Sequence, residues 1–367
     1  NIDGTFYLRG LADGTSSIAI NDLFLRKEGG GSDEEDNIST LMDSGLKSLS
    51  IIDAEIEFKS ELADLAFIMP SADALIIKED DVFKGRLKFI TLDEHSENTA
   101  VESYVSINPL NNEFSLRLDV NNFNPSHYKD IIDEFADLKK IDASFAGKAT
   151  MKGQFPSDIS SIAFDFKTNK GVIDASPLLK EKITFTKASA IGELTENVSN
   201  LSLKKLSFNL DDASFSFNGS LPNLLTKPDI NIDGEVRNLD SKTLKKYWPK
   251  DLAANARIWV GESIFDTHIS KGTIHTAIAN EALSQEALPN EAVQIELLID
   301  KGRVEYMPDF PAAKNVKGKV IIQGNKLKAI VDSATVLGGS KLIGQGSVTI
   351  PKLMEDMYNE RVEFKKK

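Results

Sequence analysis

Histidine is the residue type in this chain best suited to acid–base catalysis or metal binding, because its imidazole changes charge near neutral pH. Four histidines are present, at His95, His127, His268 and His275. His268 and His275 lie seven residues apart on strand-like segments to either side of Gly272, where a hairpin would bring the two imidazoles together. A zinc site also needs a third ligand and outer hydrogen-bond partners. No spacing in the sequence supplies them, so we predict no metal site.

Carboxylate pairs are the second group that could do chemistry, since a glycosidase uses two, one of them held in an apolar cleft. Asp80-Asp81 and Asp211-Asp212 lie between strand-like segments, which is typical of solvated turns. The acidic stretch at residues 29–37 lacks the spacing of an EF-hand loop. The sequence also has no Gly-x-Ser-x-Gly elbow, no phosphate-binding glycine loop, no His-Glu-x-x-His motif and no cysteine. We therefore expect no catalytic residue, no cofactor and no enzymatic activity.

Composition narrows the class of partner. The 367 residues include 43 basic and 56 acidic side chains, which leaves a net charge of −13. This charge argues against binding to nucleic acid or to an anionic lipid surface, both of which favour basic proteins. The absence of cysteine is compatible with an oxidising compartment. No run of apolar residues is long enough to span a bilayer, so we expect any membrane anchor of a longer protein to lie outside this chain.

Period-two alternation of apolar and polar residues dominates the chain and predicts β-strands with one buried face and one wet face. Strand-like segments recur with Gly, Asn, Asp or Pro between them, roughly twenty in all. An open sheet of more than about ten strands curls or splits. We therefore predict a mainly β fold, an elongated, curled antiparallel β-sheet that forms a long groove. A few short amphipathic helices are expected, at residues 125–138, 241–248 and 252–260.

One segment occurs twice in altered form. Residues 119–129 read DVNNFNPSHYK and residues 235–245 read EVRNLDSKTLK, each at the end of an alternating strand that leads into a short helix. Repetition on this scale predicts stacked modules. We predict an N-terminal β segment of the groove at residues 1–118 with an acidic loop at 29–37, a β-groove module at 119–234, a second at 235–350 that contains the Trp-Pro and Arg-x-Trp helices, and a C-terminal tail at 351–367.

The apolar face of the predicted sheet is the candidate binding surface. Phenylalanine makes up 20 residues against 6 tyrosines and 2 tryptophans, which favours a dry surface over a half-wet protein interface. We predict that this face lines a groove for phospholipid acyl chains, with the headgroups in water at an open seam. A one-residue change of register exchanges the two faces of a strand, so the sequence leaves open which face lies inward. The predicted lining residues are Phe114, Leu116, Leu118, Phe164, Phe166, Phe208, Leu210, Phe215, Phe217, Ile230, Ile232, Ile295, Leu297 and Ile299.

A series of short motifs follows the second copy of the repeat. Residues 247–249 read YWP, 257–260 read RIWV, 271–272 read KG, 302–308 read GRVEYMP and 315–318 read NVKG. Their ordered succession resembles the AsmA-like proteins of Gram-negative bacteria, specifically the YhdP branch. On this basis the chain is identified as a member of that family.

The resemblance implies a function and a location. AsmA-like proteins are grouped with TamB and the chorein-type bridge-like lipid transfer proteins. It therefore implies that the groove carries phospholipid between the inner and outer membranes and supports outer-membrane integrity. It also implies a periplasmic position, with the full-length protein anchored in the inner membrane and membranes as partners at its ends. The family has no catalytic residues to carry over, and its membrane-protein partners are left open.

Two other functions fit an all-β chain. The first is a non-enzymatic periplasmic or surface β-scaffold, such as an adhesin, in which the same residues fill a closed core. Solenoid coils of that kind repeat every 20 to 30 residues or so, whereas the repeat here is much longer and includes helices. The second is a carbohydrate-active enzyme, which needs a cleft rich in Trp and Tyr. The 2 tryptophans argue against it.

Overall fold

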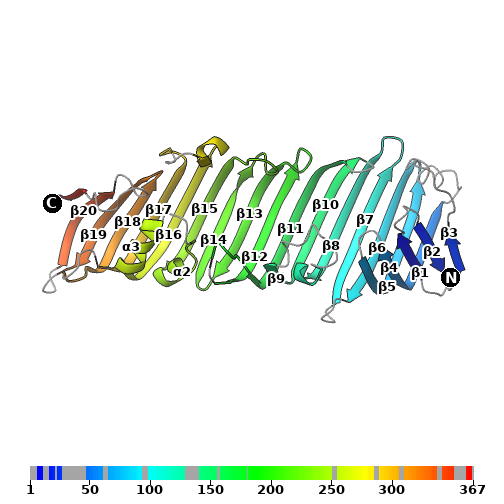
Figure 1. The fold of residues 1–367 in the computed structure, drawn as a ribbon, viewed down its shortest axis with the longest axis horizontal. Coiled ribbons are helices and arrows are strands. Elements are labelled where there is room, and N and C mark those ends of the chain that lie inside the picture. The colour runs from blue at the N-terminus through cyan, green and yellow to red at the C-terminus, as the bar shows by residue number, and fades with distance from the viewer. Residues whose placement is uncertain are drawn as a thin grey trace. The chain divides into compact units, whose positions relative to one another are not determined.

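The chain divides into two compact units. Unit 1 runs to Gly171 and includes Glu193–Val198, while unit 2 comprises Val172–Gly192 and the chain from Ser199 onward. Figure 1 labels the strands and helices of both. The computed structural model describes residues 6–10, 16–20, 23–26, 47–60, 65–92, 98–128, 140–154, 158–179, 181–249, 254–284, 289–305, 310–336, 341–350 and 361–365.

Unit 1 is built on a run of long strands. β4 to β8 pair antiparallel, each with the next, and β10 lies between β8 and β11. β1 pairs antiparallel with β2 and parallel with β4, and β2 pairs with β3. The strands are β1 (Phe6–Gly10), β2 (Ser16–Ile20), β3 (Leu23–Arg26), β4 (Ser48–Ser60), β5 (Leu65–Glu79), β6 (Val82–Leu92), β7 (Asn98–Asn108), β8 (Glu113–Phe123), β9 (Ile141–Ala143), β10 (Phe145–Gln154) and β11 (Asp158–Ile173), with a 3₁₀ turn η1 (Pro125–Tyr128) after β8.

Unit 2 is a second antiparallel run in which every strand from β13 to β21 pairs with the next along the chain. Its helices interrupt the meander between β15 and β16 (Figure 1). The elements are β12 (Ile183–Thr195), β13 (Asn200–Leu210), β14 (Ala213–Leu221), β15 (Ile230–Asp240), α2 (Ser241–Lys246), α3 (Ala254–Ser263), β16 (Ile264–Ile278), η3 (Asn280–Ser284), β17 (Val293–Val304), β18 (Lys314–Gln323), β19 (Lys326–Thr335), β20 (Lys341–Ile350) and β21 (Arg361–Lys365).

These pairings confirm the predicted mainly β, antiparallel fold with a few short helices. The described strands belong to one long sheet, and no pairing among them closes it into a barrel. The helix expected at residues 241–248 is α2, and the one expected at 252–260 is α3, which begins at Ala254. Of the helix expected at 125–138 only the turn η1 is described. Residues 129–138 and the acidic stretch at 29–37 lie outside the described residues.

Tight turns occur where the acidic pairs are found. Asp80 follows β5 with a φ of 55°, and Asp211 follows β13 with a φ of 50°. Two-residue hairpin turns need a positive φ, which Asp tolerates better than most residues. The predicted turn role of these acidic pairs is confirmed, and each pair sits at the surface.

Both copies of the repeated segment contain the same departure from regular strand geometry. Asn122 in β8 has a φ of 60°, and Asn238, at the same place in the second copy, has a φ of 55°. The strand pairing is interrupted at both sites. A left-handed residue within a strand marks a β-bulge, which bends the strand and increases its twist. Asp266 in β16 and Asn315 in β18 repeat the feature, so several strands bend by the same local device.

In both copies of the repeated segment, a side chain caps the helical turn that follows the strand. The side-chain Oδ1 of Asn124 accepts a hydrogen bond from the backbone N of Ser126 at 3.2 Å. In the second copy, Oδ1 of Asp240 accepts one from the backbone N of Thr243 at 2.6 Å and forms the N-cap of α2. A carboxylate or amide oxygen at this position satisfies a backbone donor that the helix leaves unpaired. The two segments are therefore alike in bulge and in cap.

Candidate functional site

In unit 2 the strand register places apolar residues side by side across neighbouring strands. One such row crosses six strands from β13 to β18, and a second row runs parallel to it, two residues along each strand. The first row is Leu206, Phe217, Gly234, Ile274, Ile295 and Ile322, and the second is Phe208, Phe215, Val236, Gly272, Leu297 and Val320. Every member is aliphatic, aromatic or glycine. We call this surface the apolar face of unit 2.

The opposite face of the same strands is polar. The row between the two apolar rows is Ser207, Ser216, Glu235, Thr273 and Glu296, and only its last member, Ile321 on β18, is apolar. Because successive side chains of a strand point to opposite faces, the register decides which predicted residues lie together. The nine predicted residues of unit 2 all lie on the apolar face: Phe208, Leu210, Phe215, Phe217, Ile230, Ile232, Ile295, Leu297 and Ile299.

Unit 1 has the same two-faced construction. Its apolar rows cross β6, β7, β8, β10 and β11, and the five predicted residues of this unit lie in them. One row is Phe89, Val101, Val120, Gly147 and Phe166, the next is Leu87, Ser103, Leu118, Ala149 and Phe164, the next is Gly85, Val105, Leu116, Met151 and Ile162, and the last is Phe83, Ile107, Phe114 and Gly153. Ser103 is the single polar member.

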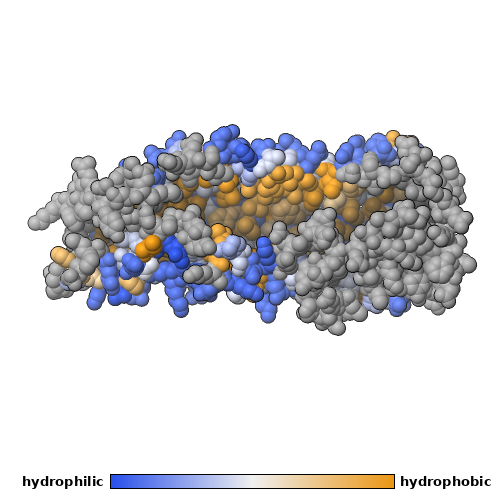
Figure 2. Space-filling view, viewed as in Figure 1, coloured by the Kyte–Doolittle hydropathy of each residue, from blue (hydrophilic) through white to orange (hydrophobic). Residues whose placement is uncertain are grey.

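Most of the predicted lining residues are neither buried in a core nor freely exposed. Thirteen of the fourteen predicted residues are half-buried, and Leu210, at 6% exposure, is buried. Among the described residues, the largest side chain with less than 2% exposure is Thr99. Figure 2 shows a hydrophobic band sunk between hydrophilic rims over β13 to β15 of unit 2, and a hydrophobic band with a hydrophilic upper rim over β10 of unit 1. Each unit therefore presents an apolar floor, and that of unit 2 has polar edges.

Three phenylalanine rings stack on one another in the apolar face of unit 2. The ring centroids of Phe208 and Phe215 lie 5.2 Å apart, and those of Phe215 and Phe217 lie 6.4 Å apart. The planes of these two pairs are inclined by only 15° and 17°. Phe208 and Phe217 lie 6.1 Å apart at 30°. We call these three side chains the phenylalanine plate.

The two helices of unit 2 cover part of its apolar face. Leu244 of α2 packs on a buried cluster of that face, which consists of Ala213, Val236, Leu239 and Ile269. Farther along, Ala256 of α3 is buried with Trp248, Trp259, Ile322 and Leu327. Ile322 and Leu327 are register partners in β18 and β19. The tryptophans of the Trp-Pro and Arg-x-Trp motifs therefore pack on the apolar face and cover one section of it.

Hydrogen bonds hold this helical cover to the sheet. The buried Ser241 accepts a bond at its Oγ from the backbone N of Thr267 at 3.2 Å. Lys245 Nζ donates to the carbonyl O of Gly261 at 2.9 Å, which links α2 to α3. Burial, and then the nearby charge of Arg303, lowers the pKa of Lys245. Both effects disfavour the charged form of the amine. The hydrogen bond to Gly261 therefore links the two helices but holds the Lys245 amine where its positive charge is disfavoured.

The comparison with known protein families agrees with this architecture. The YhdP protein family matches residues 64–364, which is most of the sequence. The chain belongs to the YhdP family. No curated protein and no solved structure matches it. The resemblance inferred from the motifs is confirmed, and YhdP is a transport-type family whose members are not known as enzymes. Within the part of the chain that is described, no helix is long and apolar enough to cross a bilayer.

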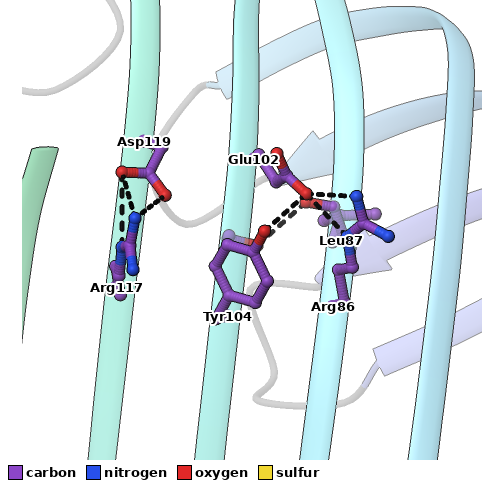
Figure 3. Close-up of polar contacts among 7 residues, drawn as sticks. Arg86, Leu87, Glu102, Tyr104, Arg117 and Asp119 are labelled. Carbon is purple, nitrogen blue, oxygen red and sulfur yellow. Dashed lines mark hydrogen bonds and ion pairs between the residues drawn. The ribbon is translucent and has the colours of Figure 1, made fainter. Parts of the chain in front are cut away.

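Charge pairs, some between neighbouring strands and some within one strand, organise the polar face of this YhdP-family chain. In unit 1, Arg86 Nε donates to Glu102 Oε1 at 2.6 Å and Tyr104 Oη donates to the same oxygen at 2.7 Å (Figure 3). Arg117 pairs with Asp119 at 2.8 Å. The guanidinium carbons of Arg86 and Arg117 lie 5.9 and 5.5 Å from the Tyr104 ring centroid. These distances are within the range of cation–π contact.

The Glu102 cluster predicts a pH dependence of stability. The hydrogen bond from Tyr104, and then that from Arg86, lowers the pKa of Glu102 below its ordinary value of 4.5. A carboxyl whose folded pKa is depressed stabilises the fold above its unfolded pKa, and this stabilisation is lost as the pH falls through the folded pKa. Glu102→Gln should therefore destabilise the protein at neutral pH and have almost no effect in acid.

Urea unfolding of the wild type and the variant at about pH 7 and about pH 3 measures this difference. High salt should reduce the effect at neutral pH, because the group is exposed and screened. A difference in unfolding free energy that stays constant from neutral to acid pH would contradict the assignment.

Each of the two described histidines of this YhdP-family chain lies beside an aspartate of a neighbouring strand. His268 and His275 both lie on β16, a single strand of 15 residues. His268 Nδ1 lies 2.7 Å from Oδ1 of Asp300, and His275 Nδ1 lies 2.7 Å from Oδ1 of Asp233. The expected hairpin at Gly272 is wrong, because this glycine is paired on both sides in the middle of the strand. His95 and the side chain of His127 lie outside the described residues.

No group of three His, Cys, Asp or Glu side chains that could hold a metal ion occurs among the described residues. An open concavity of about 670 Å³ lies along β14 to β18 of unit 2. Its lining is mostly polar and includes Asn218, Asp233, Gln294 and Gln323. The concavity lies mainly on the polar face, so it is not part of the apolar floor.

Several residues of the apolar face of this YhdP-family chain were not predicted from the sequence. Leu206, Val236 and Ile274 lie in the same rows as the predicted residues. For Leu206 and Val236 the signal was present, because each shares the alternation phase of a predicted residue on its own strand. Ile274 lies on β16, on which no lining residue was predicted. The glycines of the rows carried no such signal.

Proposed function

We propose that this chain carries phospholipid acyl chains on its apolar faces, as part of a bridge-like lipid transporter of the YhdP family. The observation that carries the proposal is the continuity of the apolar rows across neighbouring strands of each unit while their side chains stay half-buried. The function follows from the cost of moving a lipid through water. At about 0.8 kcal/mol per methylene, exposing an acyl chain of roughly 16 carbons costs on the order of 13 kcal/mol.

The polar rims support the same proposal. A phospholipid has a charged headgroup that must stay hydrated while its chains are shielded. A floor of aliphatic and aromatic side chains between hydrophilic edges fits a molecule of this type (Figure 2). Headgroups would then face water at the open seam of the groove.

The proposed setting is the periplasm of a Gram-negative cell, between the inner and outer membranes. Family membership and the absence of cysteine are consistent with a position in the cell envelope. In this setting, the full-length protein is anchored in the inner membrane and delivers phospholipid that maintains the outer membrane. Its partners are phospholipid and the two membranes, and no nucleic acid takes part.

The competing function is a scaffold or adhesin with a filled core. In a filled core, large apolar side chains interdigitate and lose nearly all their exposure. Here Phe208, Phe215 and Phe217 remain half-buried, and the buried apolar residues of the described chain include many alanines. This pattern favours a ligand-binding surface over a filled core.

Photocrosslinking can test the proposal with a matched pair of neighbouring leucines. Leu297 lies on the apolar face, whereas Leu298 is 39% exposed and pairs with Lys271 and Lys319 on the polar face. A photoreactive residue at position 297 should crosslink to copurified phospholipid, and one at position 298 should not. Lipid extraction and native mass spectrometry identify the bound species. Protein that carries no lipid and crosslinks at neither position would refute the proposed function.

A further inference from the structure

The glycine in the first apolar row of unit 2 has a specific neighbour. Gly234 in β15 is the register partner of Phe217 in β14. A Cβ atom built on Gly234 would lie 2.5 Å from Cδ1 and 2.6 Å from Cε1 of Phe217. The ring therefore occupies the space that any other side chain at position 234 would need. Glycine in a strand interior often marks such a close approach.

This contact determines how the ring lies. Because Gly234 has no side chain, the Phe217 ring can lie close against β15, nearly parallel to Phe215 at an interplanar angle of 17°. With a methyl group at position 234, the ring would have to swing away from β15. The strand backbone blocks the sheet side, so the ring would move up from the floor.

We propose that the phenylalanine plate is a discrete seat for one acyl chain and that Gly234 keeps the space above it clear. This inference rests on the proposed lipid-carrying function and adds a defined stopping place to it. The chemistry of the seat fits a hydrocarbon chain. Phe208, Phe215 and Phe217 have no polar atom on their side chains, so they offer an apolar surface without a hydrogen-bonding group.

The neighbours of the plate strengthen the assignment. Apart from Gly234, the register partners of the plate are Leu206 and Val236, and the next pair on the same face is Leu210 with Ala213, all of them apolar. Phe215 also contacts the buried cluster that contains Val236 and Ile269, which holds one side of the plate in place. The rings nevertheless stay half-buried, so their upper surface is left for a ligand.

The test places a photoreactive residue at Leu206, next to the plate, or at Leu297, on β17, and adds Gly234→Ala to each. We expect Gly234→Ala to reduce lipid crosslinking from position 206 about threefold or more, which corresponds to about 0.7 kcal/mol. Crosslinking from position 297 should change less than about twofold. Gly261→Ala is the matched control, because a Cβ at Gly261 would have no atom within 4 Å.

A second variant separates an obstructed seat from a damaged fold. Phe217→Val removes the ring atoms that a methyl group at position 234 would displace, and it keeps an apolar, β-branched side chain suited to a strand. It takes one ring from the plate but leaves the stacked pair of Phe208 and Phe215 in place. Added to Gly234→Ala, it should therefore restore about half of the crosslinking from position 206. If Gly234→Ala acted only by destabilising the sheet, the double variant would be no better than the single one, because it also loses buried ring area.

The outcomes distinguish this inference from the function on which it rests. Wild-type protein without crosslinks at positions 206 and 297 would refute the lipid-carrying function itself. Crosslinks at 297 but not at 206 would leave that function standing and overturn the seat. Full crosslinking at 206 in folded Gly234→Ala protein would overturn the role of Gly234.

Discussion

Phe215→Lys is expected to reduce the phospholipid bound by unit 2 about tenfold or more, a loss of at least about 1.4 kcal/mol. Phe215 lies in the second apolar row, between Phe208 and Val236. An ammonium group at this position must either lose its hydrating water or hold that water against the apolar face, where the acyl chain would lie. Stripping water from an unpaired charge costs several kcal/mol or so, and retained water exposes the acyl chain. Either result weakens binding, which lipid extraction followed by mass spectrometry measures.

Ser216→Lys is the matched control for this prediction. Ser216 follows Phe215 on the same strand, lies exposed on the opposite face and pairs with Glu235. A lysine there meets a carboxylate and water, so the lipid content should stay within about twofold of the wild type. If Ser216→Lys removed the lipid and Phe215→Lys retained it, lipid would bind the polar face and the assignment of the two faces would be wrong.

The faces of the strands could be predicted from the sequence because alternation is a local property. Phe215 and Phe217 lie two residues apart, so they share a face on any regular strand. What alternation cannot supply is the phase between strands, since a slip of one residue in pairing exchanges the faces. The register joins Phe215 to Val236 and Leu297 to Val320, which settles that phase for the described strands. That lipid lies on this face stays a prediction.

Glycine misled the sequence interpretation for a physical reason. Gly272 was expected to mark a turn, but it lies in the middle of β16. A Cβ there would lie 2.6 Å from Cγ1 of Val236 and 2.8 Å from Cδ2 of Leu297. The residue is small because two neighbouring strands fill its space. In a sheet with one close-packed face, glycine marks crowding as often as it marks a turn, and the sequence alone does not distinguish the two.

The packing of α2 and α3 on the apolar face could not be predicted from the sequence either. The capping residue and the proline stop predicted a helix at residues 241–248, because these signals act within one turn. The contact of Ala256 with Ile322 and Leu327 joins residues far apart in the chain, and no local pattern encodes it. The repeat was visible because its bulge and its cap are both local. The module boundaries at residues 119 and 235 stay a prediction.

The second large effect is expected from Ile269→Ala, which should lower the free energy of unfolding of unit 2 by about 2 to 5 kcal/mol. Ile269 is 3% exposed in β16 and packs with Val236 and Leu239, under Leu244 of α2. Truncation removes buried methyl groups and leaves a cavity that a bulged strand cannot close.

Thermal or urea unfolding measures this loss, and Ile258→Ala is its matched control. Ile258 lies on α3 and is 53% exposed, so its truncation should change stability by less than about 0.5 kcal/mol. Equal effects of the two substitutions would contradict the burial argument. Because the Ile269 cluster joins α2 to the floor, a large loss at Ile269 with lipid crosslinking retained at Leu206 would show that the helical cover stabilises the sheet without being needed for the phenylalanine plate. A parallel loss of crosslinking would tie the cover and the plate into one cooperative structure.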